Sequence, residues 1–352
     1  MSERWRPDSR LAVGLALILL GVLFFAPSPA CAAAPRLLAS VHKWRPSPPE
    51  RQSLASTRAR YPSSRILRYL SAKSAVVLDA GTGEVLFARN PDMPRQPAST
   101  IKILTGLIAL ESLDPRAKVT VSRRAARMPR SKVYLEPGKW YWAGDLVDAV
   151  LLASANDASV ALAEWIAGSE RAFARKMTAK ARQLGARNTV CRTASGLTAR
   201  GQYSTARDLA VMFGQAMRHP EFARRVSRAK KRAGFGRTLV NHNKALWRIR
   251  GAVGGKTGYT RAARQTYVGK FERNGRALIV AIMGSEAMWD DVERLVRYGF
   301  ARLRRQVPAP PAARLAGARP ASSASIKDRV ARLRAQLHQE AGLAPVRILS
   351  AV

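Results

Sequence analysis

Cysteine and histidine are scarce in this 352-residue chain, and their scarcity narrows its chemistry. There are two cysteines, Cys31 and Cys191, too few for a disulfide framework. If the chain is cut after Ala32, only Cys191 remains and no internal disulfide can form. No H-x-x-x-H or C-x-x-C spacing occurs, and the four histidines are scattered: His42, His219, His242 and His338. We therefore expect no metal site and no cofactor.

Acidic residues are also few, with 23 Asp and Glu against 61 Lys and Arg, which gives a net charge of +38. Between Lys73 and Phe300 there are 40 basic and 18 acidic residues, so the excess is not confined to a tail. A charge of this sign suits an anionic partner such as a phospholipid surface, an acidic polymer or nucleic acid.

The first 33 residues have the pattern of a signal peptide. Arg4, Arg6 and Arg10 precede an uncharged run from Leu11 to Phe25, and small residues at cleavage spacing follow in APSPACAAAP. An uncleaved membrane anchor is the alternative, although the run is short for a full span. Either reading predicts export to the periplasm or the outer face of the inner membrane. Export, and the absence of nucleic-acid-binding motifs, excludes nucleic acid as a partner.

Segments that flank the centre of the chain have the composition of linkers. Residues 34–71 are basic and rich in Pro and Ser, and residues 304–324 are rich in Pro and Ala. Residues 325–352 form a predicted amphipathic helix and tail, in which Ile326, Val330, Leu333 and Leu337 recur at helical spacing among Lys and Arg. The folded domain is therefore expected at 72–303.

Within that domain the hydrophobic pattern changes from strands to helices and back. Hairpins are expected around Gly81–Gly83 and Asn274–Gly275, each between β-rich runs. Helices are expected from Ser99, over 145–168 with a break at SAND, over 170–186, over 203–217 and over 289–303. This order predicts an α+β fold with a mainly antiparallel sheet, flanked by helices and built from both ends of the domain.

The pattern S-x-x-K occurs three times, starting at Ser40, Ser99 and Ser227. Ser40 lies in the first linker, and Ser227 lies in a strongly basic run. Only Ser99 heads a segment, PASTIKILTGLIALE, whose apolar residues leave little polar face. Its partner Lys102 is therefore either extended to the surface or buried for chemistry.

Two further motifs follow Ser99 in order along the chain. Residues 154–156 read Ser-Ala-Asn, and residues 256–258 read Lys-Thr-Gly, a tripeptide that occurs once. The series S-x-x-K, S-x-N and K-T-G is that of penicillin-binding proteins and related β-lactamases. Each motif alone is weak, but the three together in this order indicate a catalytic serine.

Over residues 72–303 the chain resembles the D-alanyl-D-alanine carboxypeptidases among the low-molecular-mass penicillin-binding proteins, serine peptidase family S11. Supporting stretches include LDAGTGEVLFARNPD, GLTARGQYSTARDLA and NHNKALWR. The resemblance implies an active site between the sheet and an all-helical subdomain. It also implies a peptidoglycan pentapeptide as substrate, β-lactam antibiotics as covalent inhibitors, and a role in cell-wall synthesis and cell shape.

The chemistry assigns a role to each motif. Ser99 would be the nucleophile, and Lys102, made neutral by burial and by the nearby Lys256, would be its base. By the resemblance, Ser154 relays a proton to the leaving amine and Asn156 holds the substrate amide. The resemblance also implies that Lys256 and Thr257 bind the terminal carboxylate and that the backbone N–H groups of Ser99 and Tyr259 form the oxyanion hole. Gly258 would let the strand approach the substrate closely.

The sequence departs from the family at two places. The second motif has Ala155 where Gly is common. Members of the family commonly have an Arg after the last core strand that helps to bind the substrate carboxylate. Residues 285–291, SEAMWDD, contain no Arg, so Arg261 or Arg264 would have to compensate.

Other functions remain open at this point. An endopeptidase or a β-lactamase-like hydrolase would use the same serine, although a class A β-lactamase needs a Glu, and none lies between Arg171 and Pro220. A non-catalytic cell-wall-binding protein is the alternative of another class. The C-terminal segment further predicts weak association with an anionic membrane.

Overall fold

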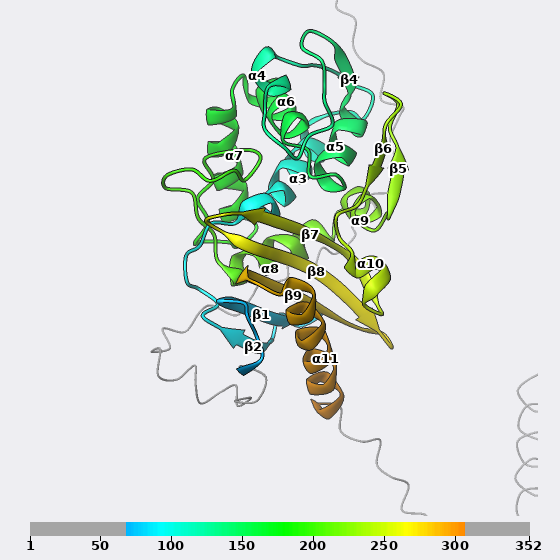
Figure 1. Cartoon of the computed structure of the whole chain (residues 1–352). Coiled ribbons are helices and arrows are strands. Elements are labelled where there is room, and N and C mark those ends of the chain that lie inside the picture. Colours follow the sequence, from blue (N-terminus) through cyan, green and yellow to red (C-terminus); the bar gives the residue numbers. More distant parts are fainter. Residues whose placement is uncertain (1–67, 307–352) are drawn as a thin grey trace, which may run out of the picture. The chain divides into compact units, whose positions relative to one another are not determined.

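The computed structural model describes residues 68–306, which contain one five-stranded sheet with helices on both faces (Figure 1). All neighbouring strands are antiparallel, in the order β2-β1-β9-β8-β7. The strands are β1 (Ser74–Asp79), β2 (Val85–Arg89), β7 (Ala252–Thr260), β8 (Arg264–Arg273) and β9 (Arg276–Ser285). The predicted α+β class with a mainly antiparallel sheet is confirmed.

Both predicted hairpins are present in this sheet. Strands β8 and β9 are joined at Asn274 and Gly275, whose φ angles of 49° and 71° suit the two left-handed positions of a tight hairpin turn. Strand β1 pairs with β2 and, on its other side, with β9, where Ser74 lies opposite Met283. The sheet therefore joins strands from the two ends of the domain, as the pattern predicted.

Each face of the sheet is covered by one long helix. Helix α8 (Ala206–Ala216) packs on β1, β8 and β9, and it begins at Thr205, whose hydroxyl accepts a hydrogen bond from the Asp208 amide. Helix α11 (Met288–Gln306) packs on the opposite face. Alternate side chains of β1 enter separate cores, Val76 on the α8 side and Val77 on the α11 side, as the two-residue period of a strand requires.

Residues between β2 and α8 form a mainly helical subdomain beside edge strand β7 (Figure 1). Its helix α3 (Lys102–Ser112), buried over most of its length, lies against α5, α6 and α7. The other elements are β3 (Lys118–Thr120), α4 (Arg123–Ala126), β4 (Trp140–Trp142), α5 (Ala143–Leu151), α6 (Asn156–Ala167) and α7 (Glu170–Gln183). Helices α5 and α6 are separated at 152–155, where a break was predicted.

Short elements escaped the sequence analysis. The missed ones are β3 and β4, α4, α9 (Pro220–Val226), α10 (Ala245–Arg248), and the two-stranded ribbon of β5 (Lys230–Arg232) and β6 (Thr238–Val240). Each has seven residues or fewer, which is too short to show a period.

The segment that begins at Ser99 differs from the expected helix start. A 3₁₀ turn, η1 (Ala98–Ile101), precedes α3, and Ser99 does not cap either element. Ala98 has a φ of 50°, a left-handed value that is uncommon for a residue with a side chain. The Ser99 hydroxyl is therefore not used as a cap at the helix end.

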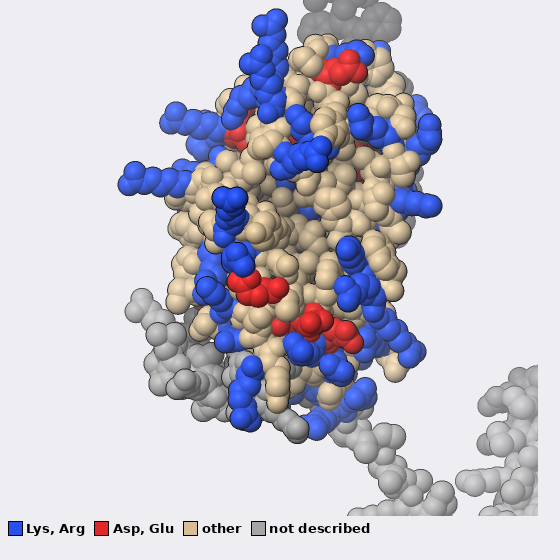
Figure 2. Space-filling view, viewed as in Figure 1, with Lys and Arg blue, Asp and Glu red and all other residues tan. Residues whose placement is uncertain are grey.

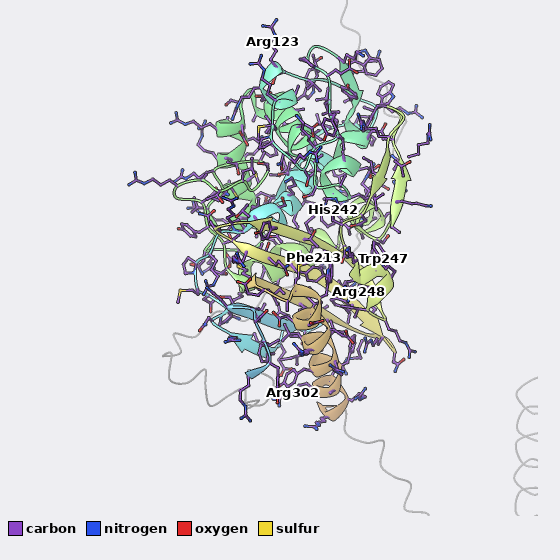
Figure 3. The ribbon with its side chains drawn as sticks, in the orientation of Figure 1. Arg123, Phe213, His242, Trp247, Arg248 and Arg302 are labelled. Atoms are coloured by element: carbon purple, nitrogen blue, oxygen red, sulfur yellow. The ribbon has the colours of Figure 1, made fainter. Side chains whose placement is uncertain are left out.

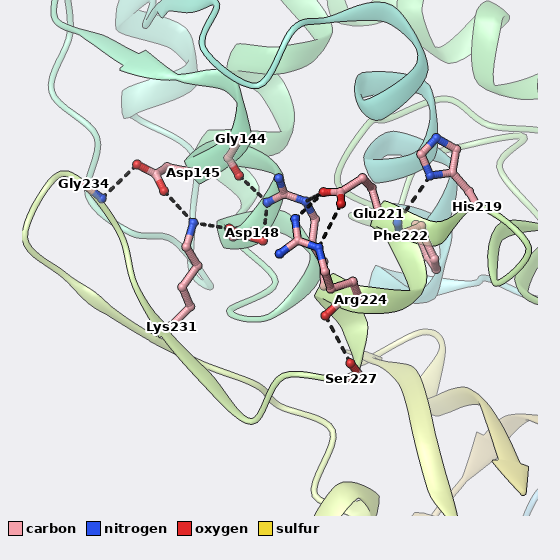
Figure 4. A network of polar contacts seen from close by, with 11 residues as sticks. Gly144, Asp145, Asp148, His219, Glu221, Phe222, Arg224, Ser227, Lys231 and Gly234 are labelled. Carbon is pink, nitrogen blue, oxygen red and sulfur yellow. Dashed lines mark hydrogen bonds and ion pairs between the residues drawn. The ribbon is translucent and has the colours of Figure 1, made fainter.

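A buried ionic network holds the subdomain to the β5–β6 ribbon (Figure 4). Asp148 of α5 is completely buried and contacts Arg225 Nη1 at 2.5 Å and Lys231 Nζ at 2.5 Å. Lys231 also contacts Asp145 at 2.9 Å. The network therefore fixes α5, α9 and β5 to one another, and α9 packs on β7.

The boundaries of the folded region are wider than expected. Leu70 is buried, and the Ser71 hydroxyl donates to Asp291 of α11 at 2.6 Å, so these residues of the predicted 34–71 linker pack on the domain. Helix α11 continues to Gln306, past the predicted boundary at 303. The predicted signal peptide at 1–33, the rest of both linkers, and the helix and tail at 325–352 lie outside the described residues.

Lys and Arg side chains are spread over both the helical subdomain and the sheet region of the face in Figure 2, with acidic groups in a few places. This distribution agrees with the excess counted between Lys73 and Phe300. Within residues 68–306, none of the helices combines the length and apolar character needed to cross a bilayer.

Candidate active site

The first pair of predicted catalytic residues lies where η1 passes into α3. The Nζ atom of Lys102 is 2.9 Å from Ser99 Oγ, and the lysine side chain is completely buried. The i, i+3 spacing across the turn brings the two groups together. Lys102 is therefore buried beside the serine and does not extend to the surface.

The Lys102 amine has two other partners. It donates to Asn156 Oδ1 at 2.7 Å and to the Ser195 carbonyl at 2.6 Å. In the neutral amine these two acceptors take both N–H bonds, so the remaining lone pair faces Ser99 Oγ and can accept its proton. Burial, and secondarily the charge of Lys256, hold the Lys102 pKa well below its ordinary value, which favours this neutral form.

A second serine–lysine pair joins the helical subdomain to the sheet. Lys256 on β7 is 2% exposed and donates to Ser154 Oγ at 2.8 Å and to the Thr257 carbonyl at 3.0 Å. Ser154 has a φ of 57°, a strained value that is found at functional sites. Burial lowers the Lys256 pKa to about 7, so this amine changes charge near neutral pH.

Asn156 connects the first pair to a neighbouring loop. Its Oδ1 accepts from Lys102, while Nδ2 donates to the carbonyls of Pro129 at 3.0 Å and Arg130 at 3.1 Å. Its backbone amide donates to the Ser131 carbonyl at 2.7 Å. The side-chain amide therefore orients Lys102, in addition to the substrate contact that was predicted for it.

Strand β7 approaches the nucleophile closely at Gly258. A Cβ atom on Gly258 would lie 2.7 Å from the Ser99 backbone nitrogen and 2.5 Å from Thr266 Oγ1. Glycine is thus required where the strand passes η1. Because β7 is an edge strand, every second N–H faces away from β8. Thr257 and the exposed Tyr259 flank the glycine on this edge.

Three participants near the site were missed by sequence reasoning. The Ser195 carbonyl binds Lys102, and backbone groups leave no signal in a sequence. The buried Glu170 accepts from the Ala194 amide at 2.9 Å and from Arg124, which fixes the loop that carries Ser195.

His242 is the third, and it lies between the sheet and the helical subdomain (Figure 3). Its backbone amide donates to the Leu152 carbonyl at 3.1 Å. Desolvation, followed by the charges of Lys256 and Lys102, lowers the His242 pKa to about 4, so the imidazole is neutral at pH 7.

Of the two arginines considered for the substrate carboxylate, one is engaged elsewhere. Arg264 donates through Nε to Glu286 at 2.8 Å, and its Nη2 contacts the other oxygen of the same carboxylate. Arg261 is exposed in the turn between β7 and β8 and forms no ion pair with the residues of 68–306. Arg261 is thus the better placed of the two for an incoming anion.

A buried serine–lysine pair, joined by a second such pair on the edge of an antiparallel sheet, defines a serine acyl-transfer site. The comparisons identify the family. Residues 60–287 match the peptidase S11 family, described as D-alanyl-D-alanine carboxypeptidase. The chain therefore belongs to family S11, which confirms the resemblance.

Individual relatives show the extent of the similarity. The D-alanyl-D-alanine carboxypeptidase DacB2 of Mycobacterium tuberculosis is 40% identical over 243 residues, which cover 65% of this chain and 82% of that protein. DacF of Bacillus subtilis, also a D-alanyl-D-alanine carboxypeptidase, is 35% identical over 223 residues, covering 61% of this chain and 57% of that protein.

A solved relative supports the fold. Penicillin-binding protein D2 of Listeria monocytogenes, in its ampicillin-bound form, superposes with a TM-score of 0.61 at 30% identity. The match covers 66% of this chain and 98% of that one. The predicted penicillin-binding fold is thereby confirmed.

Proposed function

We propose that this protein is a serine-type D-alanyl-D-alanine carboxypeptidase, which removes the terminal D-Ala from peptidoglycan stem peptides through an acyl-enzyme. The observation that carries the proposal is the Lys102 amine, buried and held between Ser99 Oγ, Asn156 Oδ1 and the Ser195 carbonyl. Family membership supplies the substrate class.

The first half of the reaction follows from this geometry. The neutral Lys102 takes the proton of Ser99 as Oγ attacks the carbonyl of the penultimate D-Ala. The N–H groups of Ser99 and Tyr259 stabilise the oxyanion, and the loss of one such donor costs about 3–4 kcal/mol of barrier. The C–N bond then breaks, and the proton taken by Lys102 passes through Ser154 to the amine of the departing D-Ala, which leaves Lys102 neutral again.

The second half restores the enzyme. Water attacks the acyl-enzyme while Lys102 takes one of its protons, and Lys102 returns this proton to Ser99 Oγ as the shortened peptide leaves. Lys256 and Thr257 hold the terminal carboxylate during the first half. A β-lactam follows the same first step, because its strained amide presents an equivalent carbonyl and carboxylate to the site.

The alternatives differ in the second half and in the leaving group. An endopeptidase uses the same acyl-enzyme with a cross-linked amine as leaving group. For a class A β-lactamase, the candidate Glu would be Glu170, directly before the stretch from Arg171 to Pro220, but its two oxygens are occupied by the Ala194 amide and Arg124. The presence of every predicted catalytic side chain argues against a non-catalytic binding protein: Ser99, Lys102, Ser154, Asn156 and Lys256.

The test uses a fluorescent penicillin and a D-Ala release assay. Ser99→Ala should abolish both the covalent adduct and the release of D-Ala, while Ser40→Ala and Ser227→Ala should retain both. Long-lived labelling supports the carboxypeptidase, and rapid turnover of the label supports the lactamase. A covalent adduct on Ser99→Ala protein would show that another residue is the nucleophile.

The location is a proposal of the same kind. We infer export to the periplasm or to the outer face of the inner membrane. The signal-peptide pattern at residues 1–33 supports this location, and so does the proposed substrate, because peptidoglycan lies outside the inner membrane. In this setting the protein would act in cell-wall synthesis and cell shape. Detection of the mature N-terminus near residue 33 in a periplasmic extract would test the inference.

A further inference from the structure

Three cations surround one exposed aromatic ring beside the site. The guanidinium carbons of Arg130 and Arg237 lie 5.8 and 5.1 Å from the centre of the Tyr134 ring, and Lys132 Nζ lies 5.4 Å from it. We call these four residues the Tyr134 cluster. Tyr134 itself is 44% exposed, so the cluster is open to solvent.

The three cations have no acidic partner within the described residues 68–306. Lys132 donates to the Ala126 carbonyl at 3.1 Å, and none of the three contacts a carboxylate there. Other arginines of the domain do find one, as Arg264 does with Glu286. Like charges gathered without a counter-charge raise the local positive potential, and the face of the ring stabilises them only partly.

The ring is held in place from both sides. The backbone amides of Val133 and Leu135 donate to the buried carboxylate of Asp157 at 3.1–3.2 Å, and both side chains are buried. Tyr134 between them has a φ of 59°, which is rare for a bulky residue. Anchoring on both sides directs the tyrosine outward at a cost in backbone strain, and such strain is concentrated at functional sites.

The cluster is connected directly to the catalytic residues. The carbonyl of Arg130 accepts from Asn156 Nδ2, and the carbonyl of Ser131 accepts from the Asn156 amide. Asn156 in turn binds Lys102. The fourth member, Arg237, lies in the turn of the β5–β6 ribbon. Strand β6 ends two residues before His242, whose pKa is lowered by burial and by the charges of the two catalytic lysines.

We propose that the Tyr134 cluster is a binding site for carboxylates of the stem peptide that lie on the N-terminal side of the cleaved bond. Lys256 and Thr257 would hold the terminal carboxylate, and the cluster would hold the anionic part of the peptide that stays on the enzyme as the acyl group. This inference rests on the proposed function, because it assumes a stem peptide in the site.

The test compares two pentapeptides that both end in D-Ala-D-Ala. In one, the α-carboxylate of the γ-linked D-Glu and the side-chain carboxylate of the diaminopimelate are free. In the other, both are amidated, so the two substrates differ only in upstream charge. The measured quantity is the ratio of kcat/KM for the acidic peptide to kcat/KM for the amidated one.

The wild-type protein should favour the acidic peptide by about fivefold or more, the scale of two exposed charge contacts. The double variant Arg130→Gln with Arg237→Gln should bring this ratio close to one. Arg297→Gln with Arg304→Gln removes the same charge from exposed positions on α11 and should leave the ratio at its wild-type value. Added salt should lower the wild-type ratio.

The outcomes separate the two proposals. Failure of the wild-type protein to release D-Ala from either peptide would overturn the proposed function. Release at equal rates from both, or an equal loss of preference in the α11 double variant, would leave the function standing and overturn the carboxylate site.

Discussion

Two buried lysines with different charges determine how the site works. Lys102 must be neutral to accept the Ser99 proton, whereas Lys256 must be charged to hold a carboxylate. Both are buried, and burial is the main cause of both lowered pKa values. The charge of Lys256 also lowers the Lys102 pKa, so protonation of one amine discourages protonation of the other.

The rate of penicillin acylation should therefore have a bell-shaped pH profile. Acylation rises as pH increases through the lowered Lys102 pKa, because the neutral base is formed. It falls above about pH 7 in the free enzyme, where Lys256 loses its proton. Stopped-flow acylation between about pH 4 and about pH 10 would measure both limbs.

Substitution of each lysine should show which residue causes each limb of the pH profile. Lys102→Arg should be nearly inactive at every pH, since a guanidinium does not release its proton in this range. Lys256→Arg should extend activity to higher pH, because its charge persists there. Near-wild-type acylation by Lys102→Arg would remove Lys102 from the role of base.

At the scale of elements, the close contact between β7 and η1 places the nucleophile. Gly258→Ala should reduce acylation by about two orders of magnitude or more, since its Cβ would lie 2.7 Å from the Ser99 nitrogen and push the oxyanion donors apart. The control is Gly275→Ala in the β8–β9 turn, where a Cβ has open space but the left-handed backbone disfavours alanine; it should cost some stability and leave acylation unchanged. Equal acylation by wild-type and Gly258→Ala protein would contradict a role for this contact.

The buried network predicts a large effect on stability. Asp148→Asn leaves Arg225 and Lys231 without their shared carboxylate, and the loss of one partner in a buried pair costs about 3–5 kcal/mol of unfolding free energy. Glu136→Gln alters the exposed pair with Lys139 and should cost less than about 1 kcal/mol. Urea titration followed by circular dichroism measures both, and similar losses would show that the network does not hold the elements together.

The sequence predicted the long elements and the motifs, and the reasons are local. Asn274–Gly275 signals a hairpin because both residues tolerate left-handed backbone, and the apolar run after Ser99 signals burial. The 3₁₀ turn at 98–101 and the Asn156 contacts with Pro129 and Arg130 depend on segments distant in sequence. The Ser195 carbonyl and the Tyr134 cluster were not predictable for the same reason, since neither forms a pattern along the chain.

At the scale of the whole molecule, the positive charge raises the question of where membrane affinity resides. We predict weak, salt-sensitive association with anionic lipid through residues 325–352, because a basic segment gains about 1 kcal/mol per cation near such a surface. Full-length mature protein should co-sediment with anionic vesicles at low salt more than a form that ends at residue 306. The end of α11 places the cut there and not at 303.

The excess positive charge of residues 73–300 could instead bind the anionic lipid. Equal co-sedimentation by the two forms would assign the affinity to the catalytic domain and dismiss the C-terminal anchor. Binding that persists at high salt would argue against an electrostatic origin.

The pairing of β1 with β9 has a consequence for the order of folding. Strand β1, from the beginning of the domain, finds its neighbour β9 about 200 residues later, so the sheet cannot assemble until the chain has been made as far as Ser285. Contacts this distant in sequence slow folding. Because Ser99 and Gly258 meet only when β7 has joined the sheet, reaction with penicillin would report that a newly made chain has finished folding.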